Sequence, residues 1–152
     1  MFEESKNNGE YGEHTVWNLL MKTDDVRSVV DVRNDKHFQE CDIDFLVENN
    51  KRQFTAVEVK TDFKAHETGN LVYELSTSGN VGCFEKTKAK FIFYYIPRLR
   101  VVYVLSVSLL RKYVNERDLE AVKMGDYATG YLIPITDLEK TGVIKRTYKG
   151  VF

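Results

Sequence analysis

Residues 41–60 read CDIDFLVENNKRQFTAVEVK, and this stretch decides the fold that we expect for the chain. Apolar and polar residues alternate with period two on both sides of Glu48–Arg52, a segment typical of a turn. The alternation predicts a β-hairpin whose first strand includes residues 41–47 and whose second strand includes residues 57–60. One face of this hairpin is apolar, and the other face carries Asp42, Asp44, Glu58 and Lys60.

The pairing of residues across the hairpin follows from the position of its turn. If the turn centres near Lys51, paired residue numbers sum to about 102, so Asp44 lies opposite Glu58 and Asp42 lies opposite Lys60. Directly opposed side chains in an antiparallel pair have Cβ atoms roughly 5 Å apart. Two carboxylates that close repel each other unless a proton or a cation lies between them.

A divalent cation is one solution for the Asp44–Glu58 pair. Mg²⁺ accepts one or two protein carboxylates and takes its other ligands from water and substrate phosphate. Lys60 would stand beside such an ion, where an ammonium orients or helps to deprotonate an attacking water, or neutralises charge on a phosphorane. This arrangement predicts a phosphodiester-cleaving site that uses Mg²⁺, with Mn²⁺ as a substitute. The same alternation is also typical of a solvated sheet face with cross-strand ion pairs.

The rest of the chain is predicted to form a single domain, residues 1–152, without a repeat or linker. Before the hairpin we expect a helix over Gly9–Met21, a strand over Val26–Val32 and a helical turn at Lys36–Gln39. After it we expect strands at Leu71–Leu75, Phe91–Ile96 and Val101–Leu105, and a helix from Val107 to Asn115 with Ser106 as its N-cap. The tail adds strands at Tyr131–Ile135 and Val143–Tyr148, with a turn at Asp137–Lys140. This order predicts an α/β domain with a central mixed sheet flanked by helices.

Composition excludes several classes of protein. Of the 152 residues, 43% are hydrophobic and 30% are charged, which is ordinary for a globular domain. The net charge of −1 argues against a protein that coats nucleic acid by bulk charge. No apolar run approaches the roughly 20 residues that span a bilayer, so we expect no membrane contact and a cytoplasmic location, in the host cytoplasm if the chain is phage-encoded. Cys41 and Cys83 are expected to be free buried thiols.

An acid occupies the inward stripe of the first predicted helix. Glu13 lies on the same helical face as Val16 and Trp17, where an apolar residue would be usual. Glu74, on a later strand, is either an auxiliary metal ligand or an exposed strand residue.

The order Asp44 … Glu58-Val59-Lys60, with the two acids 14 residues apart, resembles the D…(D/E)xK signature of the PD-(D/E)xK nuclease superfamily. This superfamily contains restriction endonucleases, archaeal Holliday junction resolvases and many phage nucleases. Gly9 and Glu13 resemble its helical GxxxE element. The resemblance covers about Gly9 to Ile96 and implies a restriction-endonuclease-like αβββαβ core.

The resemblance also implies function and site residues. It implies a metal-dependent DNA endonuclease, acting on branched or junction DNA in a phage or mobile-element setting and working as a homodimer. The resemblance implies the catalytic residues Asp44, Glu58, Lys60 and Glu13. It implies the metal ligands Asp44, Glu58 and Val59, with Asp42 as a competitor of Asp44 for the ligand position. It implies that Lys86 and Lys88 contact DNA phosphate. We prefer Asp44 to Asp42 because Asp44 faces Glu58, although Cys41-Asp42 stands where many members have Pro-Asp.

Two alternatives stay open from the sequence. The chain could be a nucleic-acid-binding module that keeps the fold without the chemistry. It could also be a phage accessory or interaction protein, with the aromatic strand Phe91–Ile96 at an interface rather than in the core. Cys83 and His66 have no flanking pattern that favours nucleophilic catalysis.

Overall fold

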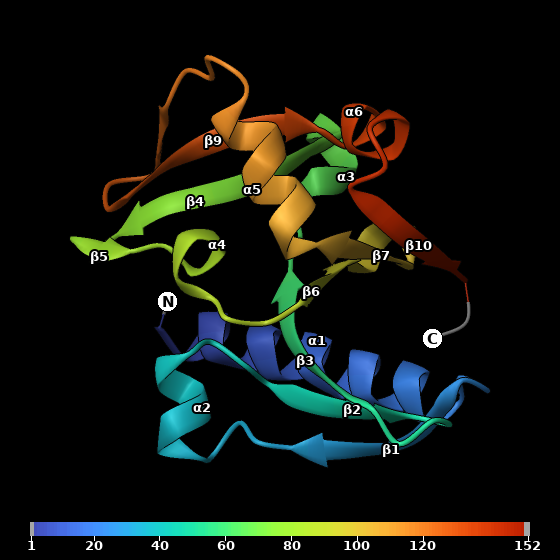
Figure 1. Cartoon of the computed structure of the whole chain (residues 1–152). Coiled ribbons are helices and arrows are strands. Elements are labelled where there is room, and N and C mark those ends of the chain that lie inside the picture. The colour runs from blue at the N-terminus through green and yellow to red at the C-terminus, as the bar shows by residue number, and fades with distance from the viewer. Residues whose placement is uncertain (1, 151–152) are drawn as a thin grey trace.

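The computed structural model describes residues 2–150 (Figure 1). The first half forms α1 (Phe2–Met21), β1 (Val26–Asp31), α2 (Lys36–Glu40), β2 (Phe45–Asn49), β3 (Phe54–Thr61), α3 (Ala65–Thr68), β4 (Asn70–Thr77) and β5 (Asn80–Val81). The second half forms α4 (Cys83–Lys86), β6 (Phe91–Ile96), the 3₁₀ turn η1 (Pro97–Leu99), β7 (Val101–Ser106), α5 (Val107–Asn115), β8 (Val122–Met124), β9 (Ala128–Pro134), α6 (Ile135–Lys140) and β10 (Ile144–Lys149).

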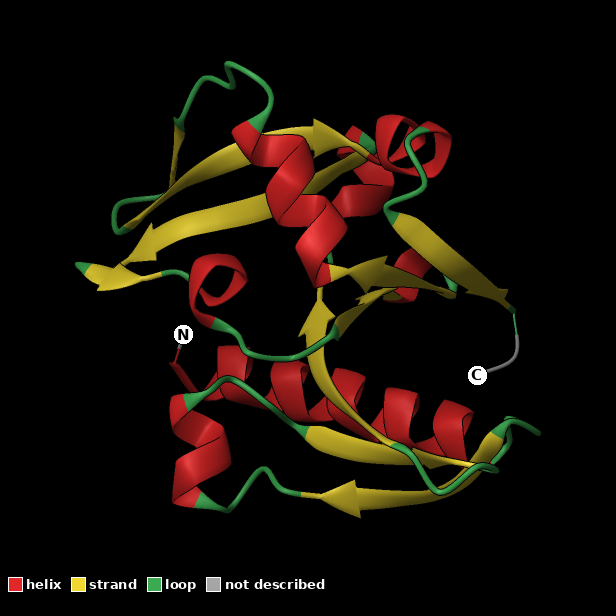
Figure 2. Ribbon diagram, in the orientation of Figure 1, coloured by secondary structure: helices red, strands yellow, loops and turns green. Residues whose placement is uncertain are grey.

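A mixed six-stranded sheet forms the centre of the molecule, in the order β1-β2-β3-β6-β7-β10. Strands β3 and β6 are parallel, and their other neighbours are antiparallel. A second sheet, in the order β5-β4-β9-β8, is antiparallel and lies beside α5 (Figure 2). The mixed α/β class and the mixed central sheet predicted from the sequence are confirmed.

The second sheet was not predicted. The expected strands around Leu71–Leu75 and Tyr131–Ile135 exist as β4 and β9, but they pair with each other instead of joining the central sheet. Parallel strands such as β3 and β6 require a long crossover connection. Here that crossover, residues 62–90, contains β4, β5 and the short helices α3 and α4. The described part of the crossover therefore has no long helix of the kind that the αβββαβ pattern implies.

The hairpin has the predicted register. Phe45 pairs with Val57 and Val47 pairs with Thr55, so paired residue numbers sum to 102. The first strand is shorter than predicted, because β2 begins at Phe45 and not near Cys41. Asp42 has φ = 47°, a left-handed conformation that Asp tolerates better than most residues. The predicted pairing of Asp42 with Lys60 is therefore wrong, since Asp42 lies outside the ladder.

The first helix is longer than predicted, because α1 begins at Phe2 instead of Gly9. The segment before Gly9 contains no proline and no β-branched residue, so nothing in its sequence stops the helix. The later helix, Val107–Asn115, has the predicted bounds, and the Ser106 hydroxyl accepts a hydrogen bond from the Leu109 N–H at 3.3 Å. No helix among residues 2–150 combines the length and the apolar character needed to cross a membrane.

The central sheet has apolar clusters on both faces. Figure 1 shows α1 lying along β2 and β3 on one side of the sheet. On this face, α1 contributes Val16 and Leu20 to a cluster with Phe45 and Val57. On the other face, β6 and β7 pack against α5, α6 and the second sheet. Strand β6 supplies both clusters, because Phe93 and Tyr95 point to one side and Ile92, Tyr94 and Ile96 point to the other. The aromatic strand is thus a core strand. The side chains of Glu58 and Lys60 point away from the α1 face.

Gly12 is a position where α1 lies very close to β3. A Cβ atom at Gly12 would lie 1.6 Å from the Thr61 hydroxyl oxygen, whereas a Cβ at Gly9 would meet nothing within 4 Å. The sequence singled out Gly9, but the packing of the helix depends on Gly12.

We expect Gly12→Ala to lower the free energy of unfolding by about 1–3 kcal/mol, because the β-branched Thr61 cannot move aside without strain. Gly9→Ala is the matched control, and we expect it to raise stability by up to about 1 kcal/mol, the helix propensity gain. Urea unfolding followed by circular dichroism measures both changes. Equal effects of the two substitutions would contradict this account of the helix contact.

Candidate active site

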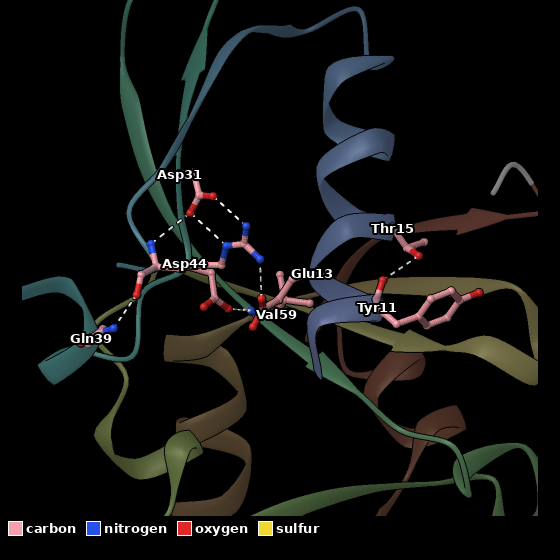
Figure 3. Close-up of polar contacts among 8 residues, drawn as sticks. Tyr11, Glu13, Thr15, Asp31, Gln39, Asp44 and Val59 are labelled. Carbon is pink, nitrogen blue, oxygen red and sulfur yellow. Dashed lines mark hydrogen bonds and ion pairs between the residues drawn. The ribbon is translucent and has the colours of Figure 1, made fainter. Parts of the chain in front are cut away.

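Asp44 lies directly before β2, at the point where the hairpin ladder ends. Its N–H donates to the Val57 carbonyl at 2.9 Å, and its Oδ2 accepts a hydrogen bond from the Val59 N–H at 2.8 Å (Figure 3). The main chain of β3 therefore fixes the orientation of the carboxylate. Burial raises the pKa of Asp44 to about 6, the Val59 N–H opposes that rise, and the nearby charge of Glu13 adds to it.

Glu58 is the buried partner of Asp44, with 7% of its surface exposed. The two carboxyl groups are close enough for the charge of Asp44 to act on Glu58, although the ladder ends at Phe45 and Val57, so Asp44 and Glu58 are not a paired position of the hairpin as predicted. Burial raises the pKa of Glu58 to about 9, and the negative charge of Asp44 contributes to the same shift. Without a cation, the pair therefore retains a proton at neutral pH.

Lys60 and Cys83 both lie beside Oε1 of Glu58. The Lys60 Nζ lies 3.9 Å from Glu58 Oε1, and the Cys83 thiol donates to the same oxygen at an Sγ–Oε1 distance of 3.5 Å. Burial favours the neutral amine of Lys60, but Cys83, Glu58 and Glu74 together raise its pKa above the usual value. Burial also raises the pKa of the Cys83 thiol. At neutral pH this corner holds an ammonium and a neutral thiol.

Cys83 was missed as a site residue, although it was correctly expected to be a free buried thiol. Cys83 reaches Glu58 because the crossover brings α4, to which Cys83 belongs, close to β3. The sequence around Cys83 carries no pattern that reports this contact. Glu74 on β4 is partly buried, and its charge contributes to the raised pKa of Lys60.

Asp42 has a different set of partners from Asp44. Its Oδ1 lies 3.2 Å from the Lys86 Nζ, and its carbonyl accepts a hydrogen bond from the Thr87 hydroxyl at 2.7 Å. These contacts fasten the segment after α2 to the segment after α4. Lys86 is thus in an ion pair in the free protein, whereas Lys88 is exposed and forms no ion pair among the described residues.

Glu13 extends from α1 toward the same centre. Its Oε2 lies 2.6 Å from the Nη1 of Arg33, in the loop after β1. Arg33 also binds Asp31 with two hydrogen bonds, Nε to Oδ1 at 2.9 Å and Nη2 to Oδ2 at 2.7 Å. Figure 3 shows Asp31, Glu13, Asp44 and Val59 gathered at one place. Asp31 and Arg33 were missed in the sequence, where the only signal is an Asp-x-Arg pattern directly after a predicted strand.

The donor atoms fit a hard divalent cation. Asp44 and Glu58 offer carboxylate oxygens, and the shared proton marks a place where a cation can replace it. Val59 has only its main-chain carbonyl to offer as a ligand, since its N–H holds Asp44. Among residues 2–150, no three His, Cys, Asp or Glu side chains are grouped to hold a metal ion. The chain would thus provide few side-chain ligands, which is the pattern that Mg²⁺ accepts when water and phosphate complete its shell.

Comparison with known proteins adds information about the fold. No protein-family model matches the chain, and no curated protein matches it. Among solved structures, the fold is similar to that of a bacterial homing endonuclease, I-Ssp6803I, with a TM-score of 0.53 and 17% sequence identity over 71% of this chain and 72% of that chain. At this identity the likeness shows a shared mixed α/β fold, and a fold alone does not assign a function.

The raised pKa of Glu58 predicts how stability depends on pH in EDTA. An acid whose pKa is raised by folding stabilises the protein below its unfolded pKa, and this contribution is lost as the pH rises through the folded pKa. For Glu58 these limits are 4.5 and about 9. We therefore expect the free energy of unfolding to fall as the pH rises through this window, and Glu58→Gln to flatten the decline.

Urea unfolding at a series of pH values measures this effect. Glu67→Gln is the control, because the Glu67 side chain is 73% exposed on α3. A decline of the same slope in wild type and Glu58→Gln would show that Glu58 is ionised in the folded protein.

Proposed function

We propose that the chain is a metal-dependent DNA endonuclease whose reaction centre consists of Asp44, Glu58 and Lys60. The observation that carries the proposal is the carboxyl pair of the buried Glu58 and the partly buried Asp44, which raises the pKa of Glu58 and has an ammonium 3.9 Å from Glu58 Oε1. A buried carboxyl pair is costly for folding, because burial disfavours the charged form of each acid. Because the pair costs folding free energy, we attribute it to cation binding and not to a structural role.

Each residue has a defined role in this proposal. Asp44, Glu58 and the main-chain carbonyl of Val59 would hold Mg²⁺ or Mn²⁺. When bound, such an ion polarises a phosphodiester oxygen and acidifies a water molecule. Cys83 holds Glu58 through its thiol, and the Val59 N–H holds Asp44.

Lys60 acts as a cation rather than as a base. Its raised pKa keeps the ammonium protonated at neutral pH. A positive charge placed beside the reacting phosphate stabilises the negative charge that builds on it during cleavage. In this proposal Lys60 does not accept the proton of the attacking water.

DNA is the substrate class that the comparisons favour. The structural neighbour is named a homing endonuclease, and the Asp44 … Glu58-Val59-Lys60 pattern resembles that of junction-resolving nucleases. Plasmid duplex and four-way junctions are both substrates to assay. The same resemblance favours a homodimer, which light scattering measures.

We expect Asp44→Asn, Glu58→Gln and Lys60→Met each to lower the cleavage rate by about 100-fold or more, since each removes a ligand or a charge at the reacting phosphate. Cleavage of plasmid and four-way-junction DNA with Mg²⁺, and its loss in EDTA, measures this. Glu48→Gln, on the same hairpin but bonded to Ser28, is the control that keeps its activity.

Activity that is equal in wild type and the three variants would end the proposal. A protein that binds DNA but takes up no Mn²⁺ through Asp44 and Glu58 would be the inactive binding module instead. Isothermal titration with Mn²⁺ separates these two outcomes without any cleavage assay.

Lys86 and Lys88 are proposed contacts for DNA phosphate. Lys88 is exposed, and Lys86 must leave Asp42 to reach a phosphate. We expect Lys88→Met to weaken DNA binding in EDTA and to lower the slope of log Kd against log salt by roughly 1, the value for one phosphate contact. Fluorescence anisotropy over a salt series measures both quantities. Lys112→Met, on α5, is the control, and an unchanged slope in Lys88→Met would remove Lys88 from the interface.

A further inference from the structure

Arg33 is fixed from several directions independently of Glu13. Asp31 binds two of its guanidinium nitrogens, and the Phe45 ring lies under the guanidinium at 5.5 Å. Its main-chain carbonyl accepts a hydrogen bond from the Gln39 side chain at 2.7 Å, and its N–H donates to Asp31. An arginine held in this way is a fixed positive charge in the structure and not a mobile surface side chain.

Glu13 is the third acid of the centre. Its charge is close enough to Asp44 to raise the pKa of that residue. A free carboxylate at this distance would add a third acidic ligand, or would help to hold a second divalent ion beside the first. The Nη1 of Arg33 binds one of its oxygens at 2.6 Å. This bond occupies the Glu13 carboxylate with a cation in the free protein.

The guanidinium of Arg33 thus lies between two carboxylates. Asp31 is on one side at 2.7 Å and Glu13 is on the other at 2.6 Å. This is the environment that a divalent cation would have if it bridged the two acids. Arg33 remains charged at every pH that the protein meets, so it supplies positive charge here permanently.

We infer that Arg33 takes the place of a second divalent ion, so that the centre of this chain binds one metal ion and uses Arg33 as its other cation. In this role Arg33 is a positioning residue, because it acts by keeping Glu13 out of the set of metal ligands. The inference rests on the proposed function of Asp44 and Glu58 as a metal centre.

Titration of the full chain with Mn²⁺, by calorimetry and by electron paramagnetic resonance of the free ion, tests the inference without DNA. The ions to count are those whose binding is lost in Asp44→Asn or in Glu13→Gln. We expect one such ion in wild type and two in Arg33→Met, in which Glu13 and Asp31 lose their shared cation. The methionine keeps apolar contact with Phe45. Arg146→Met, which removes the exposed Arg146–Asp25 ion pair, is the matched control and should keep one ion.

Glu13→Gln tests the inference even if Arg33→Met fails to fold. Because Glu13 is not a ligand, we expect Glu13→Gln to bind the single Mn²⁺ with less than the roughly tenfold loss that removal of an outer partner of a metal ligand produces. We also expect the double variant Glu13→Gln/Arg33→Met to return to one ion.

Two ions in wild type, one ion in a folded Arg33→Met, or a loss above tenfold in Glu13→Gln would each overturn the inference while the metal centre stands. Absence of any Asp44-dependent Mn²⁺ binding in wild type would overturn both the inference and the proposed function. The number of bound ions therefore separates the two failures.

Discussion

Two carboxyl groups buried against each other set the main constraint on this structure. Asp44 lies beside Glu58 because its N–H and its carboxylate both bind the main chain of β3, at Val57 and Val59, and burial raises the pKa of both acids. Such a pair cannot be doubly ionised without a compensating cation. The Val59 N–H and the Cys83 thiol hold the pair in position but supply no positive charge. Lys60 offsets part of the repulsion, but the pKa of Glu58 is still raised to about 9, so the pair keeps a proton at neutral pH when no further cation is bound.

Three acids near this pair form ion pairs with cations. Asp42 is bound to Lys86, and Glu13 and Asp31 are bound to Arg33. The cation nearest to Glu58 is Lys60, at the longer distance of 3.9 Å. Arg33 and Lys86 thus neutralise the charges of Glu13, Asp31 and Asp42. In the described part of the chain, Asp44 and Glu58 form no ion pair as short as these.

Local patterns in the sequence predicted the elements that local physics controls. Period-two alternation gave the strands of the hairpin, the polar turn gave their register, and Ser106 gave the start of α5. The same patterns did not reveal that β4 and β9 form a second sheet, because alternation marks a strand without naming its partner. They also placed the start of the first strand too early, at Cys41 instead of Phe45. The alternation of apolar and polar residues continues through Asp42, although the backbone there is left-handed and not extended.

The sequence by itself determined the register of the hairpin, because residues on one strand alternate and a short turn leaves a single register. Only the tertiary structure decided what surrounds Asp44 and Glu58. Lys86 meets Asp42 across 44 positions, Cys83 meets Glu58 across 25, and Arg33 meets Glu13 across 20. Contacts between such distant segments depend on how α1 and the crossover pack on the central sheet. Packing of this kind produces no periodic pattern in the sequence. The partner of each charged residue could therefore be identified only from the tertiary structure.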